Sequence, residues 1–175
     1  MLLIREEIDQ DYNSVNKVIE QAFREVEESD QMEHFLVNRL RHSDAFIPKL
    51  SLVAEIKGGI VGHILLTKID IESDTNSTPS LLLAPIAVTP KYQNQGIGSQ
   101  LITEAHKKAI KLGYTSIVLL GHASYYPRFG YKRAIDYGIE FPFEVPYENA
   151  MAIELIPYAL QQTNGVIKFS KAFTG

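Results

Sequence analysis

The chain has 175 residues, of which 45% are hydrophobic and 22% charged, and this length suits one domain with a real core rather than two. Its 17 basic and 21 acidic residues give a net charge of −4. The composition therefore argues against disorder, collagen and coiled coil, and gives no electrostatic support for nucleic-acid binding. Because there is no cysteine, disulfides, thiolate zinc sites and a cysteine nucleophile are excluded.

The first forty residues predict a strand followed by two helices. The strand is Leu2–Glu6. Because the four apolar residues at the N-terminus are followed directly by charged ones, there is no apolar stretch long enough for a signal peptide, and we expect none. Behind the candidate caps Asp9 and Asp11, apolar residues at helical spacing predict the first helix: Val15, Val18, Ile19, Ala22 and Phe23. A second helix is expected to begin at Asp30, where Glu33 completes a capping box. Its apolar face is expected to contain Met32, Phe35, Leu36 and Leu40.

The middle of the chain predicts strands. Leu50–Ile56 and Ile60–Ile71 are expected to pair through the hairpin turn at Lys57–Gly59, and the polar segment Glu72–Ser80 predicts an exposed loop. Leu81–Val88 is almost entirely apolar, as expected of a central strand that is buried on both faces. It is the longest apolar run and far shorter than the roughly 20 residues of a membrane helix. We therefore expect a cytoplasmic protein.

A strand–helix–strand unit follows. The helix is expected over Ile97–Leu112 with Gly113 as its C-cap, and its inner face contains Ile97, Leu101, Ala105, Ala109 and Leu112. Because Ser116–Leu120 is another apolar strand, it should lie parallel to and beside Leu81–Val88. Tyr125–Phe129 predicts a short helix, and further strand residues are expected in Gly130–Phe141, Met151–Ile156 and Val166–Phe169. The sequence predicts one mixed α/β domain over residues 1–175.

The segment between the predicted strand and helix is typical of an anion site. A buried strand stops at Pro90, and a loop with Gly96 and Gly98 opens directly into the helix, whose first turn has unpaired N–H groups and the positive end of the dipole. A Rossmann fingerprint is excluded because Leu101 stands where its third glycine would be, and Gly98 is not followed by the Lys of a P-loop. The alternative is that the two glycines only serve a tight turn.

Three segments resemble one family. Gln93-x-x-Gly96-x-Gly98 closely resembles the Gln/Arg-x-x-Gly-x-Gly/Ala signature of the GNAT superfamily of acetyl-CoA-dependent N-acetyltransferases, and the strand before it is similar to that family's fourth strand. Tyr125–Tyr131 looks like the family's Tyr-x-x-x-Gly-Phe segment, with Tyr in place of Phe. Met151–Phe169 resembles the YhbS-like branch of the family. The resemblance implies a mostly antiparallel sheet, flanked by helices, with a parallel fourth and fifth strand splayed around acetyl-CoA.

The resemblance also implies the residues of the site. The backbone of the fourth strand should pair with the pantetheine arm, the glycine turn should hold the pyrophosphate, and Tyr126 matches the residue that protonates the leaving thiol in many members. The implied residues for coenzyme A are Ile86, Ala87, Val88, Gln93, Asn94, Gln95, Gly96, Ile97, Gly98, Ser99 and Tyr126. The alternative for Tyr126 is a packing tyrosine.

The general base is left open. His122, just after the fifth strand, has a side chain that titrates in the useful range; Glu33, His63 and a chain of waters are alternatives. Glu33 also fits a helix-surface carboxylate, and His63 a hydrogen-bonded sheet histidine. The remaining histidines, His34, His42 and His106, are expected on helix surfaces, and no metal site is expected.

The implied activity is transfer of an acetyl group from acetyl-CoA to a primary amine by direct attack in a ternary complex. The alternative is a coenzyme A-binding sensor or interaction module without catalysis. The expected partner is a small-molecule or protein amine, with no nucleic acid and no membrane, and a homodimer is left open. Four carboxylates in Glu25–Asp30 suggest the further hypothesis that cationic amines are preferred.

Overall fold

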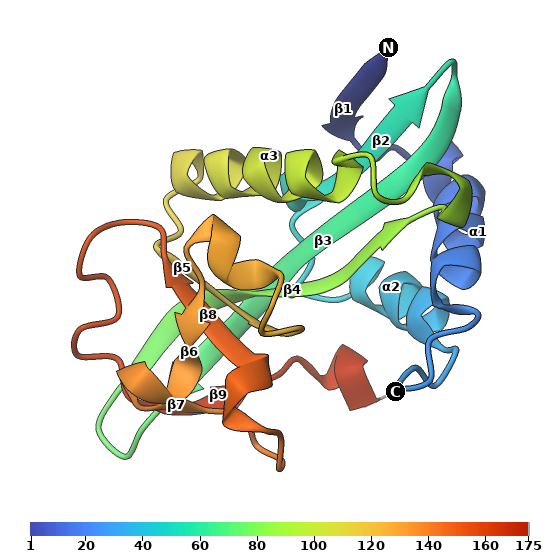
Figure 1. Cartoon of the computed structure of the whole chain (residues 1–175). Helices are drawn as coiled ribbons and strands as arrows, with labels where there is room; N and C mark the ends of the chain where they lie inside the picture. Colours follow the sequence, from blue (N-terminus) through green and yellow to red (C-terminus); the bar gives the residue numbers. More distant parts are fainter. Residues whose placement is uncertain (175) are drawn as a thin grey trace.

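The computed structural model describes residues 1–174, and the strands in this part of the chain form one mixed sheet (Figure 1). Along its main path the order is β1-β2-β3-β4-β5-β8-β6, and β9 pairs with β3 and with β7. The strands are β1 (Leu2–Glu6), β2 (Ser51–Ile56), β3 (Gly59–Glu72), β4 (Ser77–Val88), β5 (Ser116–Leu120), β6 (Lys132–Arg133), β7 (Ile139–Glu140), β8 (Ala150–Glu154) and β9 (Gly165–Lys168). The helices are α1 (Tyr12–Phe23), α2 (Glu33–Arg41) and α3 (Ile97–Lys111), and a short 3-10 helix, η4 (Tyr126–Phe129), follows β5.

The predicted parallel pair is confirmed and is short. β4 and β5 pair in parallel only at Leu81–Ile117 and Leu82–Val118. Beyond these residues the described chain has no further β4–β5 pairs, so the strands diverge as they run toward Val88 and Leu120. The remaining pairs along the main path are antiparallel, which confirms the expected fold class.

The two faces of the sheet carry different helices. Side chains alternate between faces along a strand, so Ile64 and Leu66 of β3 pack with Leu101 of α3. Leu65, between them, packs on the other face with Val15 of α1. Figure 1 shows α3 lying apart from α1 and α2, on the opposite side of the long strands β3 and β4. The sheet is therefore the middle layer of three.

The start of α2 differs from the prediction. The helix begins at Glu33 rather than Asp30, because the Asp30 carboxylate accepts a hydrogen bond from the N–H of Met32 (2.9 Å) and closes a local turn instead of a cap. The Glu33 carboxylate accepts from the Ser29 hydroxyl. The predicted apolar face is confirmed only in part: Leu40 is buried and Leu36 packs against the core. Met32 and Phe35 are each 52% exposed, and Val37 is buried instead.

The N-terminal cap of α1 also differs. Asp11 is the N-cap residue, but its side chain does not cap the helix. Its carboxylate instead accepts hydrogen bonds from Arg5 (2.7 Å) and from the N–H of Ile8 (2.9 Å). Arg5 holds the pKa of Asp11 below its ordinary value by hydrogen bonding to the carboxylate, although burial works in the opposite direction.

The predicted loop Glu72–Ser80 is mostly strand. β3 runs to Glu72 and β4 starts at Ser77, with Asp70 opposite Pro79, so only residues 73–76 form the turn. The polar side chains that suggested a loop face solvent at the exposed end of a hairpin, where the backbone can pair without burying them.

At the end of α3 the backbone follows the prediction, but the packing of the side chains does not. Gly113 has φ +93°, its N–H bonds the carbonyl of Ile110, and the N–H of Tyr114 bonds that of Ala109, which together form a Schellman motif. Leu112, expected on the inner face, is 39% exposed, and Ile102 is fully buried instead. The helix face that contacts the sheet therefore ends one turn earlier than expected.

The segment Gly130–Phe141 contains less strand than expected. Only β6 and β7, of two residues each, pair there, and a 3-10 helix over Ala134–Tyr137 separates them. The short helix predicted at Tyr125–Phe129 is confirmed as η4.

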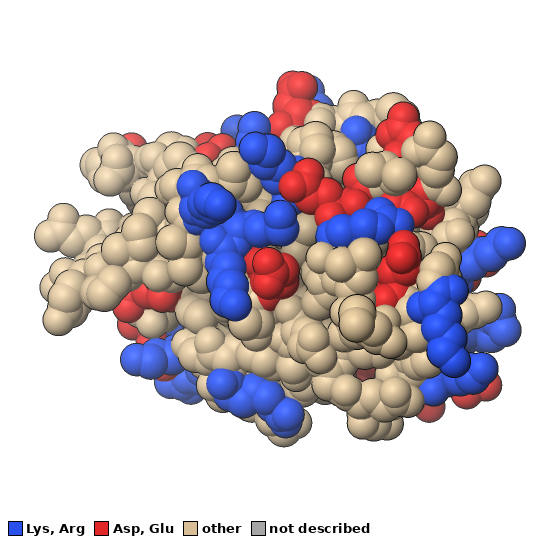
Figure 2. Space-filling model, turned by 90° about the horizontal axis from the view of Figure 1, so that it is seen from above, with Lys and Arg blue, Asp and Glu red and all other residues tan. Residues whose placement is uncertain are grey.

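Charges of both signs are mixed on the face seen from above in Figure 2. Ion pairs join Arg5 to Asp11 and Glu55, and Lys108 lies 3.5 Å from Glu6. None of the helices in residues 1–174 combines the length and apolarity needed to cross a membrane.

Candidate functional site

A groove of about 650 Å³ opens where β4 ends and α3 begins. Its walls come from the last residues of β4, the turn into α3, the first turn of α3 and the segment after β5. The lining residues are Ile86, Ala87, Val88, Tyr92, Gln93, Asn94, Gly96, Ile97, Gly98, Ser99, His122, Tyr125 and Arg128. The divergence of β4 and β5 leaves this end of β4 unpaired on one edge.

The turn into α3 has a backbone that suits an anion. Gly96 is the N-cap residue with φ +82°, and Asn94 is also left-handed, with φ +63°. The Gln93 amide Nε2 donates to the carbonyl of Val88 (2.9 Å) and so ties the turn to the end of β4. The first intrahelical bond runs from Gln100 to Gly96, so the N–H groups of the residues before Gln100 are free to bind a ligand.

Gly98 leaves room at the bottom of this groove. A Cβ atom at Gly98 would lie 3.2 Å from the Tyr125 hydroxyl and 3.9 Å from Cδ1 of Ile86. The glycine therefore keeps the first turn of α3 close to the opposite wall, which the segment after β5 supplies.

Most of the residues implied by the family resemblance lie in this one groove; two do not line it. Gln95 lies on the exposed outer side of the turn, with its Nε2 3.5 Å from the carbonyl of Lys91. Tyr126 is buried and is not one of the lining residues. Sequence reasoning did not place Tyr92, Tyr125 or Arg128 in the groove, although all three line it. The spacing of Tyr125 and Arg128, one helical turn apart, could have placed them on the same wall.

Tyr126 is a buried side chain, 8% exposed. Its ring is edge-on to the rings of Tyr125 and Tyr131, with centroids 5.1 and 5.8 Å away, and it packs against Gly121, where a Cβ atom would collide with it. Burial raises the pKa of Tyr126 to about 12, with a smaller contribution from Tyr125. The phenol is therefore protonated at neutral pH.

His122 and His63 have contrasting environments. His122 is exposed and lines the groove, and its carbonyl accepts the N–H of Tyr125 (3.1 Å). His63 is fully buried in β3, with its Nε2 3.0 Å from the Ser51 hydroxyl, which confirms a hydrogen-bonded sheet histidine. Burial, with a smaller contribution from Arg41, lowers the pKa of His63 to about 3.

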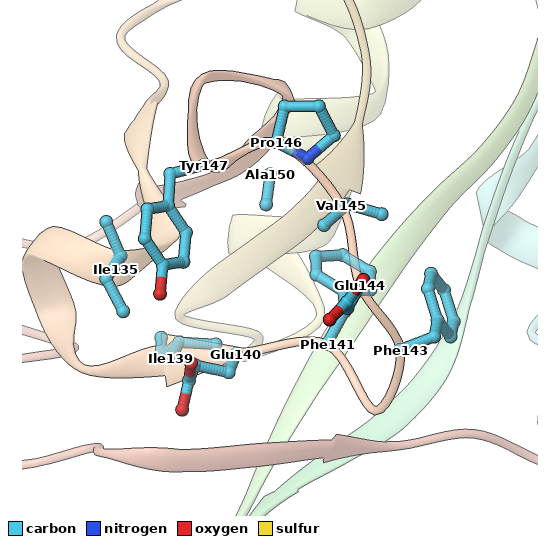
Figure 3. Close-up of a pocket in the computed structure, with 10 residues that line it drawn as sticks. All are labelled: Ile135, Ile139, Glu140, Phe141, Phe143, Glu144, Val145, Pro146, Tyr147 and Ala150. Carbon is cyan, nitrogen blue, oxygen red and sulfur yellow. The ribbon is translucent and has the colours of Figure 1, made fainter.

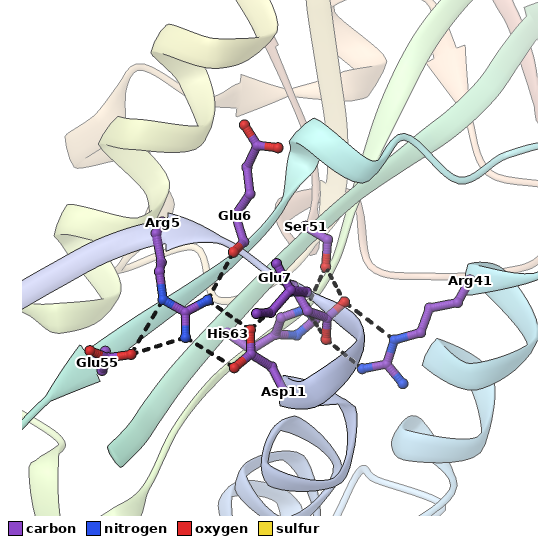
Figure 4. A network of polar contacts seen from close by, with 9 residues as sticks. Arg5, Glu6, Glu7, Asp11, Arg41, Ser51, Glu55 and His63 are labelled. Carbon is purple, nitrogen blue, oxygen red and sulfur yellow. Dashed lines mark hydrogen bonds and ion pairs between the residues drawn. The ribbon is translucent and has the colours of Figure 1, made fainter. Parts of the chain in front are cut away.

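His63 belongs to a buried polar network between the sheet and α2 (Figure 4). Glu7 and Arg41 form an ion pair of 2.6 Å whose two side chains are each 1% exposed. The Ser51 hydroxyl donates to Glu7 (2.9 Å). The guanidinium of Arg41 also lies 4.0 Å from the centre of the Tyr12 ring. These contacts fasten the end of α2 to β1 and β2.

The other histidines fall into two groups. His42 is exposed as expected, and His34 lies 3.8 Å from Glu20 near the surface. His106, also expected on a helix surface, instead packs against Tyr131, with its Nε2 2.8 Å from the phenol oxygen, and burial lowers its pKa to about 4. Within residues 1–174, no group of three or more acidic or histidine side chains is arranged to hold a metal ion.

Two of the other cavities in the described part of the chain bear on where an acceptor could enter. One, of about 580 Å³, is bordered by Glu25, Arg24 and Lys91, between the end of α1 and the end of β4. The other, of about 660 Å³, has mainly apolar walls around β7 and the start of β8. Figure 3 shows Tyr147 and Phe143 toward its two ends in that view, with the carboxylates of Glu140 and Glu144 between them.

Comparisons with known proteins identify the family. The acetyltransferase (GNAT) domain model matches residues 48–133. Over 140 residues the chain is 36% identical to YjhQ of Escherichia coli strain K12, an uncharacterized N-acetyltransferase, which covers 79% of this chain and 75% of YjhQ. The chain belongs to the GNAT acetyltransferase family.

Other GNAT proteins match over almost the whole chain. YhbS of Escherichia coli strain K12, also an uncharacterized N-acetyltransferase, is 27% identical over 98% of both chains. The crystal structure of Escherichia coli YhbS in complex with CoA has a TM-score of 0.88 at 25% identity, covering 99% of this chain and 92% of that one. A Brucella melitensis GNAT acetyltransferase in complex with acetyl-CoA has a TM-score of 0.80 at 32% identity, covering 99% and 98%.

Proposed function

We propose that this protein transfers an acetyl group from acetyl-CoA to a primary amine of a small molecule or protein, by direct attack in a ternary complex. The observation that carries the proposal is the groove between the unpaired end of β4 and the first turn of α3. The CoA and acetyl-CoA complexes of its two structural relatives support the choice of cosubstrate.

The proposed binding mode uses backbone groups. Alternate N–H and C=O groups of β4 face β3, to which Ile86, Ala87 and Val88 are paired. The other N–H and C=O groups face the side on which β4 is no longer paired with β5. There they can form hydrogen bonds with the pantetheine amides. The pyrophosphate is held by the amides of residues 95–99, because that turn offers free N–H groups and the positive end of the helix dipole.

The reaction needs support for an oxyanion and a leaving thiolate. When the amine attacks the thioester carbonyl, negative charge develops on its oxygen, and an N–H donor from β4 can stabilise it by about 3 kcal/mol. The conjugate acid of the leaving thiolate has a pKa of roughly 8.5, like that of cysteine. We assign Tyr126 as the residue that donates a hydrogen bond to this thiolate. We assign His122, which is exposed at the groove, as the general base that accepts the proton of the attacking amine.

The alternative remains a coenzyme A-binding module without catalysis. Both hypotheses predict CoA binding, which calorimetry measures directly. They differ in turnover: the enzyme releases free thiol from acetyl-CoA in proportion to added amine, whereas the module releases none across a broad panel of amines. Failure to bind CoA at all would overturn both. We also propose that residues 1–175 act as one domain, which the single sheet containing β1 to β9 supports. A cytoplasmic location is proposed from the sequence pattern alone.

A further inference from the structure

The groove has one strong cationic side chain among its described lining residues. The turn into α3 offers an anion backbone N–H groups, and the other polar side chains of the wall are hydroxyls, amides and one histidine; Arg128 is the single Lys or Arg among the lining residues. A groove that holds a pyrophosphate through amides alone offers no full positive charge, so the position of this guanidinium matters for the affinity.

Arg128 is held in place without a carboxylate partner. Its Nε donates to the carbonyl of Tyr125 (3.0 Å), and its guanidinium carbon lies 4.7 Å from the centre of the Tyr125 ring. In residues 1–174 no hydrogen bond or ion pair engages its two terminal nitrogens. Arg5, Arg41 and Arg133, by contrast, all pair with carboxylates. Arg128 is thus oriented at one end and has free donors at the other, which suits bidentate binding of a phosphate.

Tyr125 connects this arginine to the anion-binding turn. Its hydroxyl comes within 3.2 Å of the position that a Cβ of Gly98 would occupy, while Arg128 stacks on the same ring. The ring therefore spans the groove from the first turn of α3 to the guanidinium. An anion at the turn has amides on one side and a preoriented cation on the other.

We propose that Arg128 binds the pyrophosphate of acetyl-CoA from the wall opposite α3, and that Tyr125 is its positioning residue. The assignment rests on the proposed use of acetyl-CoA. The pyrophosphate, rather than the 3′-phosphate of the ribose, is chosen because the Tyr125 ring links Arg128 to the glycine turn. The role goes beyond the backbone cradle, because it adds a side chain whose charge can be removed by mutation.

The test measures CoA and dephospho-CoA binding by calorimetry. Arg128→Met should weaken the binding of both ligands about tenfold, the loss expected when an exposed side chain gives up a charge-assisted contact, and Arg128→Lys should lose less. Tyr125→Leu, which removes the stacking ring, should resemble Arg128→Met, whereas Tyr125→Phe should retain most of the affinity. The matched control is Arg133→Met, whose side chain lies outside the groove and pairs with Asp136.

The outcomes separate the two levels of the proposal. Equal losses of affinity for the two ligands support the pyrophosphate assignment. In turnover, the same variants should raise the KM for acetyl-CoA more than they change kcat. A loss that disappears with dephospho-CoA would place Arg128 on the 3′-phosphate and overturn the assignment, as would unchanged affinity in a variant with a wild-type melting temperature. A wild-type protein that binds neither ligand would instead refute the proposed function.

Discussion

The position of Tyr126 limits what it can do chemically. A phenol with a pKa of about 12 gives up its proton to a thiolate only uphill, by roughly 3.5 units against a thiol near 8.5. Full proton transfer is therefore unfavourable, whereas a hydrogen bond to the developing thiolate needs no transfer. In the proposed reaction, burial would therefore keep Tyr126 protonated as a hydrogen-bond donor to the thiolate, rather than let it act as a general acid that gives up its proton.

Tyr126→Phe removes only the hydroxyl, so we expect kcat to fall about tenfold while CoA affinity stays within about threefold. Steady-state kinetics at saturating amine and calorimetry with CoA measure the two quantities. Tyr137→Phe, outside the groove, is the control. If Tyr125→Phe is the slower enzyme of the adjacent pair, the donor role belongs to Tyr125.

His106 should make stability depend on pH. Its pKa is lowered to about 4 in the fold and is near 6.5 in the unfolded chain, so below pH 6.5 the unfolded state binds a proton that the folded state does not. The free energy of unfolding should therefore fall as the pH drops from 6.5 toward 4, by at most about 2 kcal/mol at pH 5 from this residue.

Urea unfolding at pH 7.5 and pH 5 measures this difference. His106→Gln should reduce the loss of stability between the two pH values. Tyr131→Phe, which removes the hydrogen-bond partner but keeps His106 buried, should leave most of the loss in place. An equal loss in wild type and His106→Gln would mean that this histidine does not contribute.

Among the elements, the turn into α3 should respond strongly to an added side chain at Gly98. Gly98→Glu adds a carboxylate between the Tyr125 hydroxyl and the proposed pyrophosphate, so steric and like-charge conflict should weaken CoA binding at least tenfold, or about 1.4 kcal/mol. Gly98→Ala, which adds only a methyl group, is the matched variant and should lose less. Unchanged affinity in a folded Gly98→Glu protein would place the cosubstrate elsewhere.

The ion pair at the end of α2 should be important for stability. Arg41→Met leaves the Glu7 carboxylate buried without its cation, and removing one partner of such a pair typically costs 3–5 kcal/mol. Adding Glu7→Gln should recover part of the loss, which a double-mutant cycle in urea measures. Arg39→Met, an exposed arginine on the same helix, should cost much less. Simple additivity in the cycle would show that the pair is not coupled.

The elements that the sequence predicted well are those whose apolar pattern matches their burial. β5, the core of β4 and the βαβ order follow from runs such as Leu81–Val88. The start of α2 was wrong because Asp30 offered a good capping pattern that a local turn used instead. The glycine turn was predictable from its residues. The burial of Tyr126 could not be predicted, because it depends on the packing of its ring against Gly121 and two neighbouring aromatic rings.

At the scale of the whole molecule, the groove and the two cavities described above raise the question of where the amine enters. The acidic segment is defined here as Glu25–Asp30, with its four carboxylates. If the acidic segment steers cations, replacing Glu25, Glu27 and Glu28 by Gln should lower kcat/KM for a cationic amine a fewfold at low salt. It should also flatten the salt dependence, because such attraction is screened over about 10 Å at 0.1 M. Arg24 and Lys91 border the same cavity as Glu25, so the effect should be modest.

The matched control makes the same charge change at Glu140 and Glu144, which line the apolar cavity, and at Glu148, which follows the lining residue Tyr147 in sequence. Kinetics with a cationic amine at low and high salt compare the two triple variants. If only the control variant responds, the amine enters beside β7 and β8, and the acidic segment has no part in acceptor choice.

The long strand β3 shares one of its edges between distant parts of the chain. Toward its start it pairs with β2, but its last residues pair with β9, with Ile71 opposite Ile167. During translation the backbone groups of residues 70–72 therefore remain an open edge until β9 has left the ribosome, and open edges recruit other strands. Gly165 lets β9 come close enough to cover this edge, since a Cβ there would collide with the carbonyl of Glu72. A nascent chain stalled before residue 165 would thus expose a sheet edge that the finished protein covers.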